Sequence, residues 1–286
     1  MMRIGKISFL AALLASCGGQ SPTTPTLVAS FYPIAYLTSR IAGDKYEVHC
    51  LVPAGEEPHD FDLRPSGARA IEDADALFLN GLGMEGWADS LSPKVKSKAH
   101  VLSEGLDTLS IEGRVDPHVW LDPVRYKEMG RHCMEALCEI DPKNIVTYQM
   151  NYGSFAAEID RLIAHCETLS ADFSNKVIAV SHAAFGYMAD RFSFKQLYIN
   201  GVSPDDEPSQ KAIEGILEAI QTYGIDTVFF EELASDEVAR RIAEATGAKC
   251  ESLNPLEGLE QDEIDAGENY FSVYKENMRK IAEARP

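Results

Sequence analysis

The sequence predicts an α/β fold of two lobes, each with a mainly parallel sheet flanked by helices, joined by one long rigid helix. Three observations predict it. Short apolar strands alternate with helical patterns along the chain, as in α/β proteins. The 286 residues suit two medium domains better than one. A helical pattern over residues 142–169 interrupts the alternation, and about 28 residues at about 1.5 Å each would span roughly 42 Å.

The first half of the chain alternates strands with helices. Strands are expected over residues 27–31, 46–52 and 76–80, and helices over residues 33–42, 66–73 and 124–140. Pro53 breaks the second strand and Gly81 ends the third. In the last helix Met129, Cys133 and Leu137 recur four apart, which is the spacing of one helix face. These elements form the expected N-terminal lobe, residues 27–141.

The second half begins at Asp141-Pro142, which ends one helix and starts the next because proline is favoured at the first helical position. The connecting helix is expected over residues 142–170. Beyond it, strands are expected over residues 177–180, 227–230 and 249–253, and helices over residues 209–223, 235–246 and 269–284. These elements form the expected C-terminal lobe, residues 171–286.

The N-terminus has the features of an export signal, expected over residues 1–16. Arg3 and Lys6 precede the apolar run of residues 7–15. This run is too short to span a bilayer, which takes about 20 residues, but it suits a signal peptide. The run ends in Leu14-Ala15-Ser16-Cys17, which resembles the bacterial lipoprotein cleavage box, whose cysteine receives lipid. The alternative is a soluble secreted protein with a chance cysteine at this position.

Residues 17–26 are polar and contain proline, and they are expected to form a flexible tether. The body of the protein is therefore expected outside the cytoplasm, in the periplasm or on the cell surface, held on a bacterial membrane by lipid on Cys17. Five cysteines follow Cys17. Because this number is odd, at least one thiol is unpaired in the monomer that we expect.

The charge balance argues against one class of partner. With 45 Asp and Glu against 26 Lys and Arg, the chain has a net charge of −19. This charge repels phosphate backbones, so no nucleic-acid partner is expected. The same charge suits a protein whose ligand is a cation.

Three of the seven histidines share a loop context. His59 comes after the strand that ends at Val52, His182 follows the strand over residues 177–180, and His118 lies in a Pro-flanked loop. Ligands of open α/β sheets bind at the carboxyl ends of strands, and imidazole is a common zinc ligand. One such histidine would more often be structural, but three favour a metal site. No part in it is expected for the other four, His49, His100, His132 and His165.

Five segments, taken in order, resemble one family. They are PHDFDLRPS from Pro58, DPHVWLDP from Asp116, SHAAFGY from Ser181, SPDDEPS from Ser203 and LNPLEGL from Leu253. With these segments spread over nearly the whole mature chain, the sequence resembles the zinc- and manganese-binding lipoproteins of metal ABC transporters. The resemblance implies a solute-binding component that holds one metal between two lobes.

The resemblance also implies four metal ligands, which are carried over onto His59, His118, His182 and Glu257. Glu231 and Glu232 follow the strand over residues 227–230 and compete with Glu257 for the fourth place. Zinc is favoured because it accepts nitrogen and oxygen ligands in a tetrahedron, whereas manganese, the alternative, prefers harder oxygen ligands. Residues 102–115 contain no histidine, unlike the His-rich loop of many zinc-binding members.

The partners implied by the resemblance are a membrane permease and a separate ATPase chain, since no Gly-x-x-x-x-Gly-Lys-Ser/Thr loop occurs here. No catalytic residue and no enzymatic activity are expected. Two rival functions stay open. A tethered zinc hydrolase would need an open metal position, and neither a His-Glu-x-x-His nor a Gly-x-Ser-x-Gly motif occurs. A surface adhesin is neither favoured nor excluded by the sequence.

Overall fold

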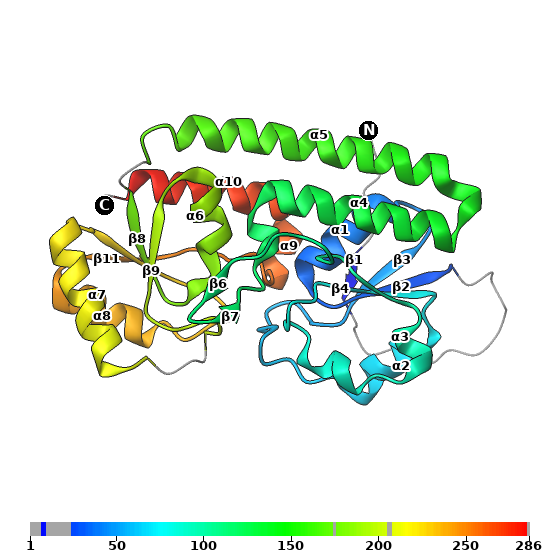
Figure 1. The fold of residues 1–286 in the computed structure, drawn as a ribbon, viewed down its shortest axis with the longest axis horizontal. Coiled ribbons are helices and arrows are strands. Elements are labelled where there is room, and N and C mark those ends of the chain that lie inside the picture. The colour runs from blue at the N-terminus through cyan, green and yellow to red at the C-terminus, as the bar shows by residue number, and fades with distance from the viewer. Residues whose placement is uncertain (1–6, 10–23, 174–175, 205–207, 285–286) are drawn as a thin grey trace. The chain divides into compact units, whose positions relative to one another are not determined.

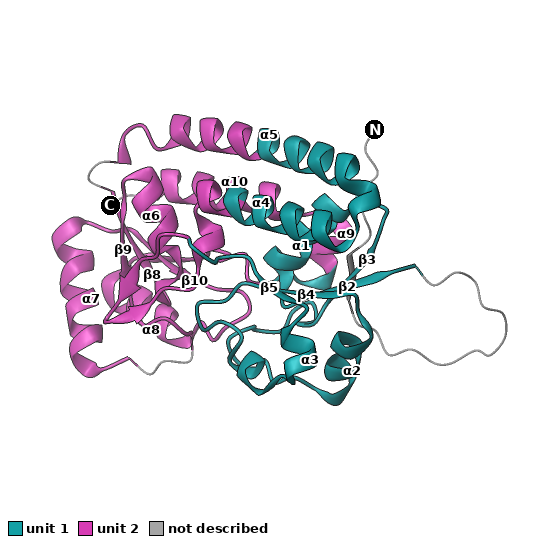
Figure 2. Ribbon diagram, turned by 45° about the vertical axis from the view of Figure 1, so that its right-hand side comes forward, with its two compact units in different colours: residues 1–105, 127–158, 258–261 teal, residues 106–126, 159–257, 262–286 magenta. Residues whose placement is uncertain are grey.

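The computed structural model describes residues 7–9, 24–173, 176–204 and 208–284. The chain folds as two compact units, which Figure 2 colours separately. Unit 1 comprises residues 1–105, 127–158 and 258–261, and unit 2 comprises residues 106–126, 159–257 and 262–286. Three of the passages from one unit to the other fall inside helices, in α4 (Pro123–Ile140), in α5 (Ile145–Leu169) and after the first residue of α9 (Gln261–Ala266).

Unit 1 is built on a parallel sheet with the strand order β1-β3-β2-β4-β5 (Figure 1). Its strands are β1 (Ile7–Phe9), β2 (Thr26–Ala29), β3 (Glu47–Cys50), β4 (Ala76–Leu79) and β5 (Ala99–Val101). Its shorter helices are α1 (Tyr32–Ala42), α2 (Pro65–Asp73), α3 (Pro93–Lys96) and the 3-10 turn η1 (Gly86–Ser90). Helix α1 packs against β2, β3 and β4, and α2 packs against β2.

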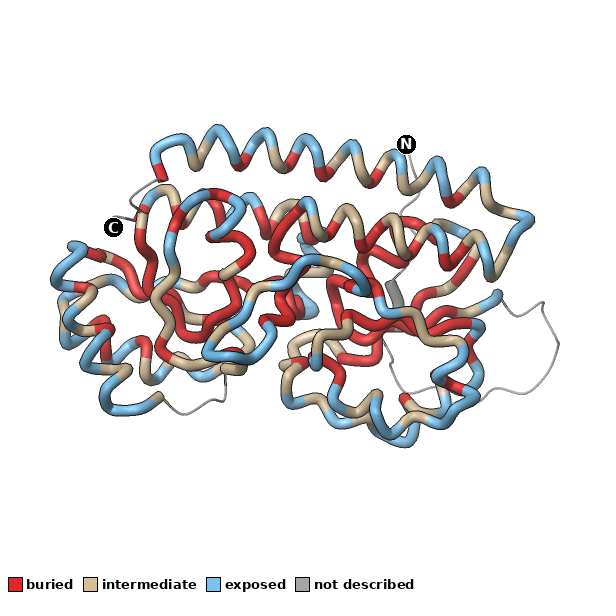
Figure 3. The backbone as a smooth tube through the Cα atoms, viewed as in Figure 1, coloured by how far each residue is buried: buried red, intermediate tan, exposed pale blue. Residues whose placement is uncertain are grey.

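The apolar pattern of the strands explains how this sheet is covered. Neighbouring side chains of a strand point to opposite faces of the sheet. Val28, Leu77 and Leu79 form one apolar core with Ile71 of α2 and Val95 of α3. Helix α1 is buried along its whole length. Figure 3 accordingly shows the central strands and α1 among the buried parts of the chain.

The helical stretch predicted over residues 142–169 is divided in the structure. Pro142–Asn144 form a 3-10 turn, η3, and α5 then runs for 25 residues from Ile145. The Asp141 carboxylate accepts hydrogen bonds from Asn144 Nδ2 (2.6 Å) and the Tyr148 hydroxyl (2.8 Å). These two bonds hold the tight turn, which the periodicity of the sequence did not reveal.

Unit 2 contains a second parallel sheet with the strand order β11-β10-β8-β9. Its strands are β8 (Val177–Val180), β9 (Lys195–Tyr198), β10 (Thr227–Phe230) and β11 (Lys249–Ser252). Its helices are α6 (Gly186–Phe192), α7 (Gln210–Tyr223), α8 (Glu237–Thr246), α9 (Gln261–Ala266, whose first residue falls in unit 1), α10 (Tyr270–Glu283) and the 3-10 turns η2 (Val119–Leu121) and η5 (Ala183–Phe185). A short antiparallel hairpin, β6 (Ser110–Ile111) and β7 (Arg114–Val115), precedes η2.

Helices α7 and α8 cover one face of this sheet. Ile216 and Ile220 of α7 and Ile242 of α8 share an apolar core with Ala179 of β8 and Val228 of β10. The predicted fold class is confirmed, since each unit has a parallel sheet flanked by helices and α5 is long. The sequence did not predict β5 and β9, which are short edge strands with polar residues, although the edge strand β11 was predicted over residues 249–253.

The predicted N-terminal segments are only partly described. Ile7–Phe9, inside the expected signal peptide, form strand β1 beside β3. The rest of that segment, Cys17 and the expected tether up to residue 23 lie outside the described residues. Among the helices that the structure describes, not one has the length and apolar character of a membrane-spanning segment.

Two helical glycines give a matched test of the packing in unit 1. A Cβ atom on Gly130 of α4 would lie 2.9 Å from Cε1 of the buried Phe155, whereas one on Gly153 of α5 would meet nothing within 4 Å. We expect Gly153→Ala to stabilise the protein by about 0.5–1 kcal/mol. We expect Gly130→Ala to destabilise it by about 1–3 kcal/mol through overpacking. Thermal unfolding followed by circular dichroism measures both, and shifts of the same sign would contradict this packing.

Candidate metal centre

The candidate site of unit 2 begins at the carboxyl ends of two neighbouring strands. The chain passes from β8 to β9 on one side, and β10 pairs with β8 on the other side. The strand order therefore changes direction at β8, and open α/β sheets bind ligands at such a switch point. His182 follows β8 and Glu231 follows β10, and both side chains are buried. Glu231 Oε1 lies 2.5 Å from His182 Nδ1 and accepts a hydrogen bond from the Ser181 hydroxyl at 2.8 Å.

His118 is held by the aspartate two residues before it. Asp116 Oδ1 accepts a hydrogen bond from the His118 backbone N–H at 3.0 Å and lies 2.7 Å from His118 Nδ1. The Tyr187 hydroxyl, from α6, donates to the Asp116 carbonyl at 2.8 Å. Each imidazole therefore has a carboxylate against its Nδ1 atom.

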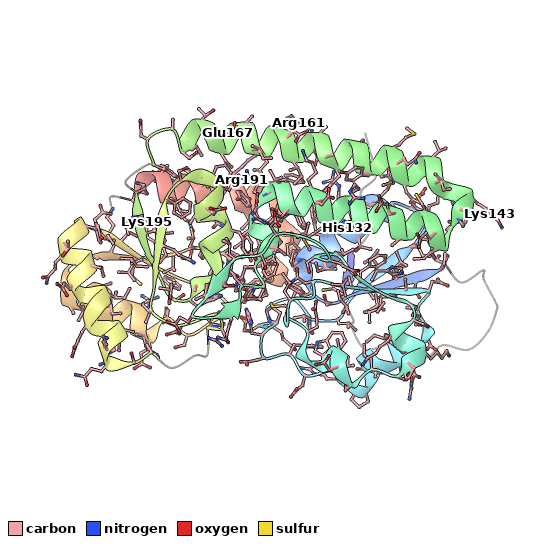
Figure 4. All side chains as sticks on the ribbon, in the orientation of Figure 1. His132, Lys143, Arg161, Glu167, Arg191 and Lys195 are labelled. Atoms are coloured by element: carbon pink, nitrogen blue, oxygen red, sulfur yellow. The ribbon has the colours of Figure 1, made fainter. Side chains whose placement is uncertain are left out.

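A buried ion-pair network fixes the segment that carries His118. The Asp122 carboxylate is buried and accepts two hydrogen bonds from Arg191 of α6, each at 2.8 Å. Arg125 Nη1 also lies 2.5 Å from Asp122 Oδ2. Figure 4 labels Arg191 on α6. A buried carboxylate that has two cationic partners resists displacement, so the loop before α4 is firmly anchored to α6.

Glu257 lies in a buried loop after β11 that is also fixed by hydrogen bonds. Asn277 of α10 donates to the Asn254 carbonyl at 2.6 Å and accepts from its N–H at 3.1 Å. The Trp120 indole N–H donates to the Pro255 carbonyl at 2.8 Å. Leu256 adopts a left-handed φ of 62°, which is uncommon for a residue with a Cβ atom and is found at functional turns.

Three acceptor atoms converge where these segments meet. His118 Nε2 and His182 Nε2 are 3.3 Å apart, and Glu257 Oε1 lies 2.9 Å from the first and 3.6 Å from the second. A carboxylate only accepts hydrogen bonds, so when these rings are neutral each Nδ1 carries the proton and each Nε2 presents its lone pair. A tetrahedron with bonds of about 2.0–2.1 Å has edges of about 3.3 Å. This spacing suits a small divalent cation.

The surrounding carboxylates also affect the protonation of His118 and His182. Burial lowers the pKa of His118, but the Asp116 carboxylate and then Glu257 raise it by more, so the pKa lies above its usual 6.5. Burial opposes the Glu231 and Glu257 carboxylates in the same way at His182, whose pKa lies well above 6.5. Without a metal, these three acceptor atoms therefore share a proton.

The structure brings together three of the four predicted ligands within unit 2, with ligand atoms of His118, His182 and Glu257 all within 4.8 Å of one another. His59 belongs to unit 1, in the loop after β3, where its backbone N–H donates to Glu57 Oε1 at 2.8 Å. That loop is tied to residues 258–261 of the same unit by a hydrogen bond from Gly55 N–H to the Leu259 carbonyl, at 3.1 Å.

Glu231 and Glu232, the alternatives to Glu257 as the fourth ligand, do not join the three converging atoms. Glu231 contacts Nδ1 of His182, and Glu232 is exposed. The sequence suggested Glu231 only as a metal ligand and did not assign a role to Asp116. A signal for Asp116 was present, since a carboxylate two residues before a histidine can reach its Nδ1 atom.

Comparison with known proteins gives one family. A family model described as "ZnuA: Zinc-uptake complex component A periplasmic" matches residues 27–284. The chain is 32% identical over 282 residues to the zinc-binding protein AdcA of Streptococcus pyogenes serotype M1, and the match covers 89% of this chain and 55% of AdcA. The chain thus spans about half the length of these AdcA relatives. It is 31% identical over 299 residues to the high-affinity zinc uptake system protein ZnuA of Bacillus subtilis, with 95% of this chain and 93% of ZnuA covered.

A solved structure shares the fold. The Zn(II)-bound ZnuA-like domain of Streptococcus pneumoniae AdcA matches with a TM-score of 0.80 and 31% identity, and the match covers 91% of this chain and 98% of that domain.

The role of Glu231, whose carboxylate contacts His182, can be tested with the neighbouring Glu232 as a control. Glu231→Gln keeps the volume but removes the charge that orients His182 and makes it more basic, so we expect Zn²⁺ affinity to fall by about ten- to hundredfold. Glu232→Gln, at the exposed neighbour, should leave affinity unchanged. Competition titration with a chelating dye measures both variants. Equal effects at the two positions, or no effect at Glu231, would contradict the assigned role.

Proposed function

The chain belongs to the family of periplasmic zinc-uptake components, and on that premise we propose that it captures Zn²⁺ outside the cytoplasm and delivers it to a membrane transporter. The convergence of His118 Nε2, His182 Nε2 and Glu257 Oε1 in unit 2 carries this proposal. Two neutral imidazoles and a carboxylate are typical zinc ligands. The fixed loops around them should favour capture over exchange with solvent.

We further propose that His59 supplies the fourth ligand. Three donors leave one position of a tetrahedron open, and the resemblance of the PHDFDLRPS segment to the family supports a ligand at His59. Because Leu259 is bonded to the His59 loop and lies two residues after Glu257, movement of that loop would be transmitted along the chain to a second ligand. A metal held in this way would link the two units.

Zinc is the cargo that the donor set favours. Manganese prefers harder oxygen ligands, and with His59 the proposed set has three nitrogens and one oxygen. The names of the relatives AdcA and ZnuA point to the same metal. A fully occupied tetrahedron leaves no position for a reacting water, so the proposal is transport and not zinc-dependent hydrolysis.

Delivery requires partners outside this chain. We propose that a membrane permease receives the metal and that a separate ATPase chain drives transport. The relative from Streptococcus pneumoniae is named a zinc-binding lipoprotein, which supports the proposal that lipid on Cys17 anchors this chain to the membrane. Labelling with a fatty-acid analogue in a bacterial host, with Cys17→Ser as control, tests the anchor.

The ligands are tested one at a time by substitution. We expect His59→Ala, His118→Ala, His182→Ala and Glu257→Ala each to weaken Zn²⁺ binding by on the order of a hundredfold, because each removes a ligand and outer-shell changes alone cost ten- to hundredfold. His165→Ala, at an exposed position on α5, is the control and should bind like the parent. Parent-like binding by His118→Ala or His182→Ala would refute the proposed site. Parent-like binding by His59→Ala alone would refute only the fourth ligand.

Zinc affinity should also depend on pH. The pKa values of His118 and His182 are raised above 6.5, so protons compete for the Nε2 atoms at higher pH than for an ordinary histidine. We expect affinity to be greatest above these raised pKa values and to start falling, as pH decreases, before pH 6.5 is reached. Proton release on Zn²⁺ addition in weakly buffered solution provides the measurement. Affinity that stays constant down to pH 6 would contradict the raised pKa values.

A further inference from the structure

Gly186, the first residue of α6, lies against the carboxylate that supports His118. A Cβ atom added to Gly186 would lie 2.9 Å from Asp116 Oδ2 and 3.2 Å from Gln196 Nε2. At the first distance a methyl group and an oxygen atom are too close, so one of them has to shift. All of these residues belong to unit 2. The absence of a side chain at this position is therefore a feature of the packing around the candidate metal centre.

The backbone of Gly186 gives no reason for a glycine. Its φ of −57° and ψ of −46° lie in the right-handed helical region, which every residue type with a Cβ atom can adopt. Alanine is favoured over glycine in a helix because it loses less conformational freedom on folding. The contact with Asp116, and not the local conformation, explains the glycine.

The Asp116 carboxylate has no free direction in which to move. Its backbone is held on both sides, since its N–H donates to the Leu109 carbonyl at 2.9 Å and its carbonyl accepts from the Tyr187 hydroxyl at 2.8 Å. Its Oδ1 atom accepts from the His118 N–H and lies 2.7 Å from His118 Nδ1. Oδ2 is buried, and no described residue hydrogen-bonds it. Pressure on Oδ2 would therefore rotate the carboxylate and disturb the contacts of Oδ1 with His118.

The side chain on the other flank of Gly186 supports the second imidazole. Gln196 Oε1 accepts from the Phe185 N–H at 3.0 Å, and Gln196 Nε2 donates to the Ala183 carbonyl at 3.3 Å. These two bonds hold the η5 turn that directly follows His182. A methyl group on Gly186 could not avoid Asp116 by moving toward Gln196 without loosening this turn.

On the premise of the proposed zinc-binding function, we propose that Gly186 is a positioning residue of the metal centre. Its lack of a side chain allows the Asp116 carboxylate to reach and orient His118 while Gln196 holds the turn after His182. Changes in groups that orient metal ligands typically cost ten- to hundredfold in affinity. We expect Gly186→Ala to lower Zn²⁺ affinity by about this factor.

A double-mutant cycle with Asp116 separates positioning from a general structural defect. Competition titration with a chelating dye should show weaker Zn²⁺ binding by Gly186→Ala and by Asp116→Ala, and no further loss when both are combined, because the displaced carboxylate is then absent. Gly215→Ala on α7, where a Cβ atom would meet nothing within 4 Å, is the control and should bind like the parent. Parent-like affinity of Gly186→Ala, or the same loss with and without Asp116, would overturn the proposal.

Thermal unfolding of the metal-free protein tests the contact without zinc. Gly186→Ala should lower Tm in the parent chain but leave it unchanged or raise it in Asp116→Ala, where the methyl group can move into the space of the missing carboxylate. If Gly186→Ala alone does not fold, recovery of folding in the double variant supports the contact. A lower Tm in both backgrounds, or a double variant that stays unfolded, would overturn it. A parent chain that bound no Zn²⁺ would instead refute the proposed function, and with it the role of Gly186 in metal binding.

Discussion

Mutual repulsion among three buried acceptor atoms is the constraint on which the centre of unit 2 depends. His118 Nε2, His182 Nε2 and Glu257 Oε1 approach one another to between 2.9 and 3.6 Å. Burying such atoms without a positive charge among them is unfavourable by several kcal/mol. A proton supplies that charge when no metal is bound, and the Asp116 and Glu231 carboxylates, followed by Glu257, raise the pKa values of the two histidines. A divalent cation satisfies all three atoms at once.

The fold of unit 2 holds these atoms together against their repulsion. Each ligand comes from a different segment, and each segment has its own anchor. Glu231 orients His182 at the carboxyl end of β8, and the pairing of Asp122 with Arg191 fixes the loop that carries His118. The loop before Glu257 is bonded to Trp120 and Asn277. The site is therefore preorganised, and little ordering is left to oppose metal binding.

Much of this could be predicted from the sequence. Strands 177–180 and 227–230 were predicted with their observed ends, because buried parallel strands are continuous apolar runs. The polar edge strand β9 and the η3 turn were not predicted, because no local sequence pattern distinguishes β9 from a loop or η3 from the start of a long helix. The loop context of His59, His118 and His182 suggested a metal site, and the family resemblance over nearly the whole mature chain implied the set of four ligands with Glu257. The role of Glu231 depends on a contact between two loops far apart in the sequence, which only coordinates reveal, whereas Asp116 lies two residues before His118 and could have been recognised from that spacing.

X-ray absorption at the zinc edge of the zinc-loaded protein is the most direct test of the central claim. We predict a first shell of four nitrogen and oxygen atoms at about 2.0–2.2 Å, with the outer-shell scattering of imidazole rings. The imidazole contribution should decrease in His118→Ala and in His182→Ala. A shell of six oxygen atoms, a shell containing sulfur, or spectra unchanged by both substitutions would contradict the account.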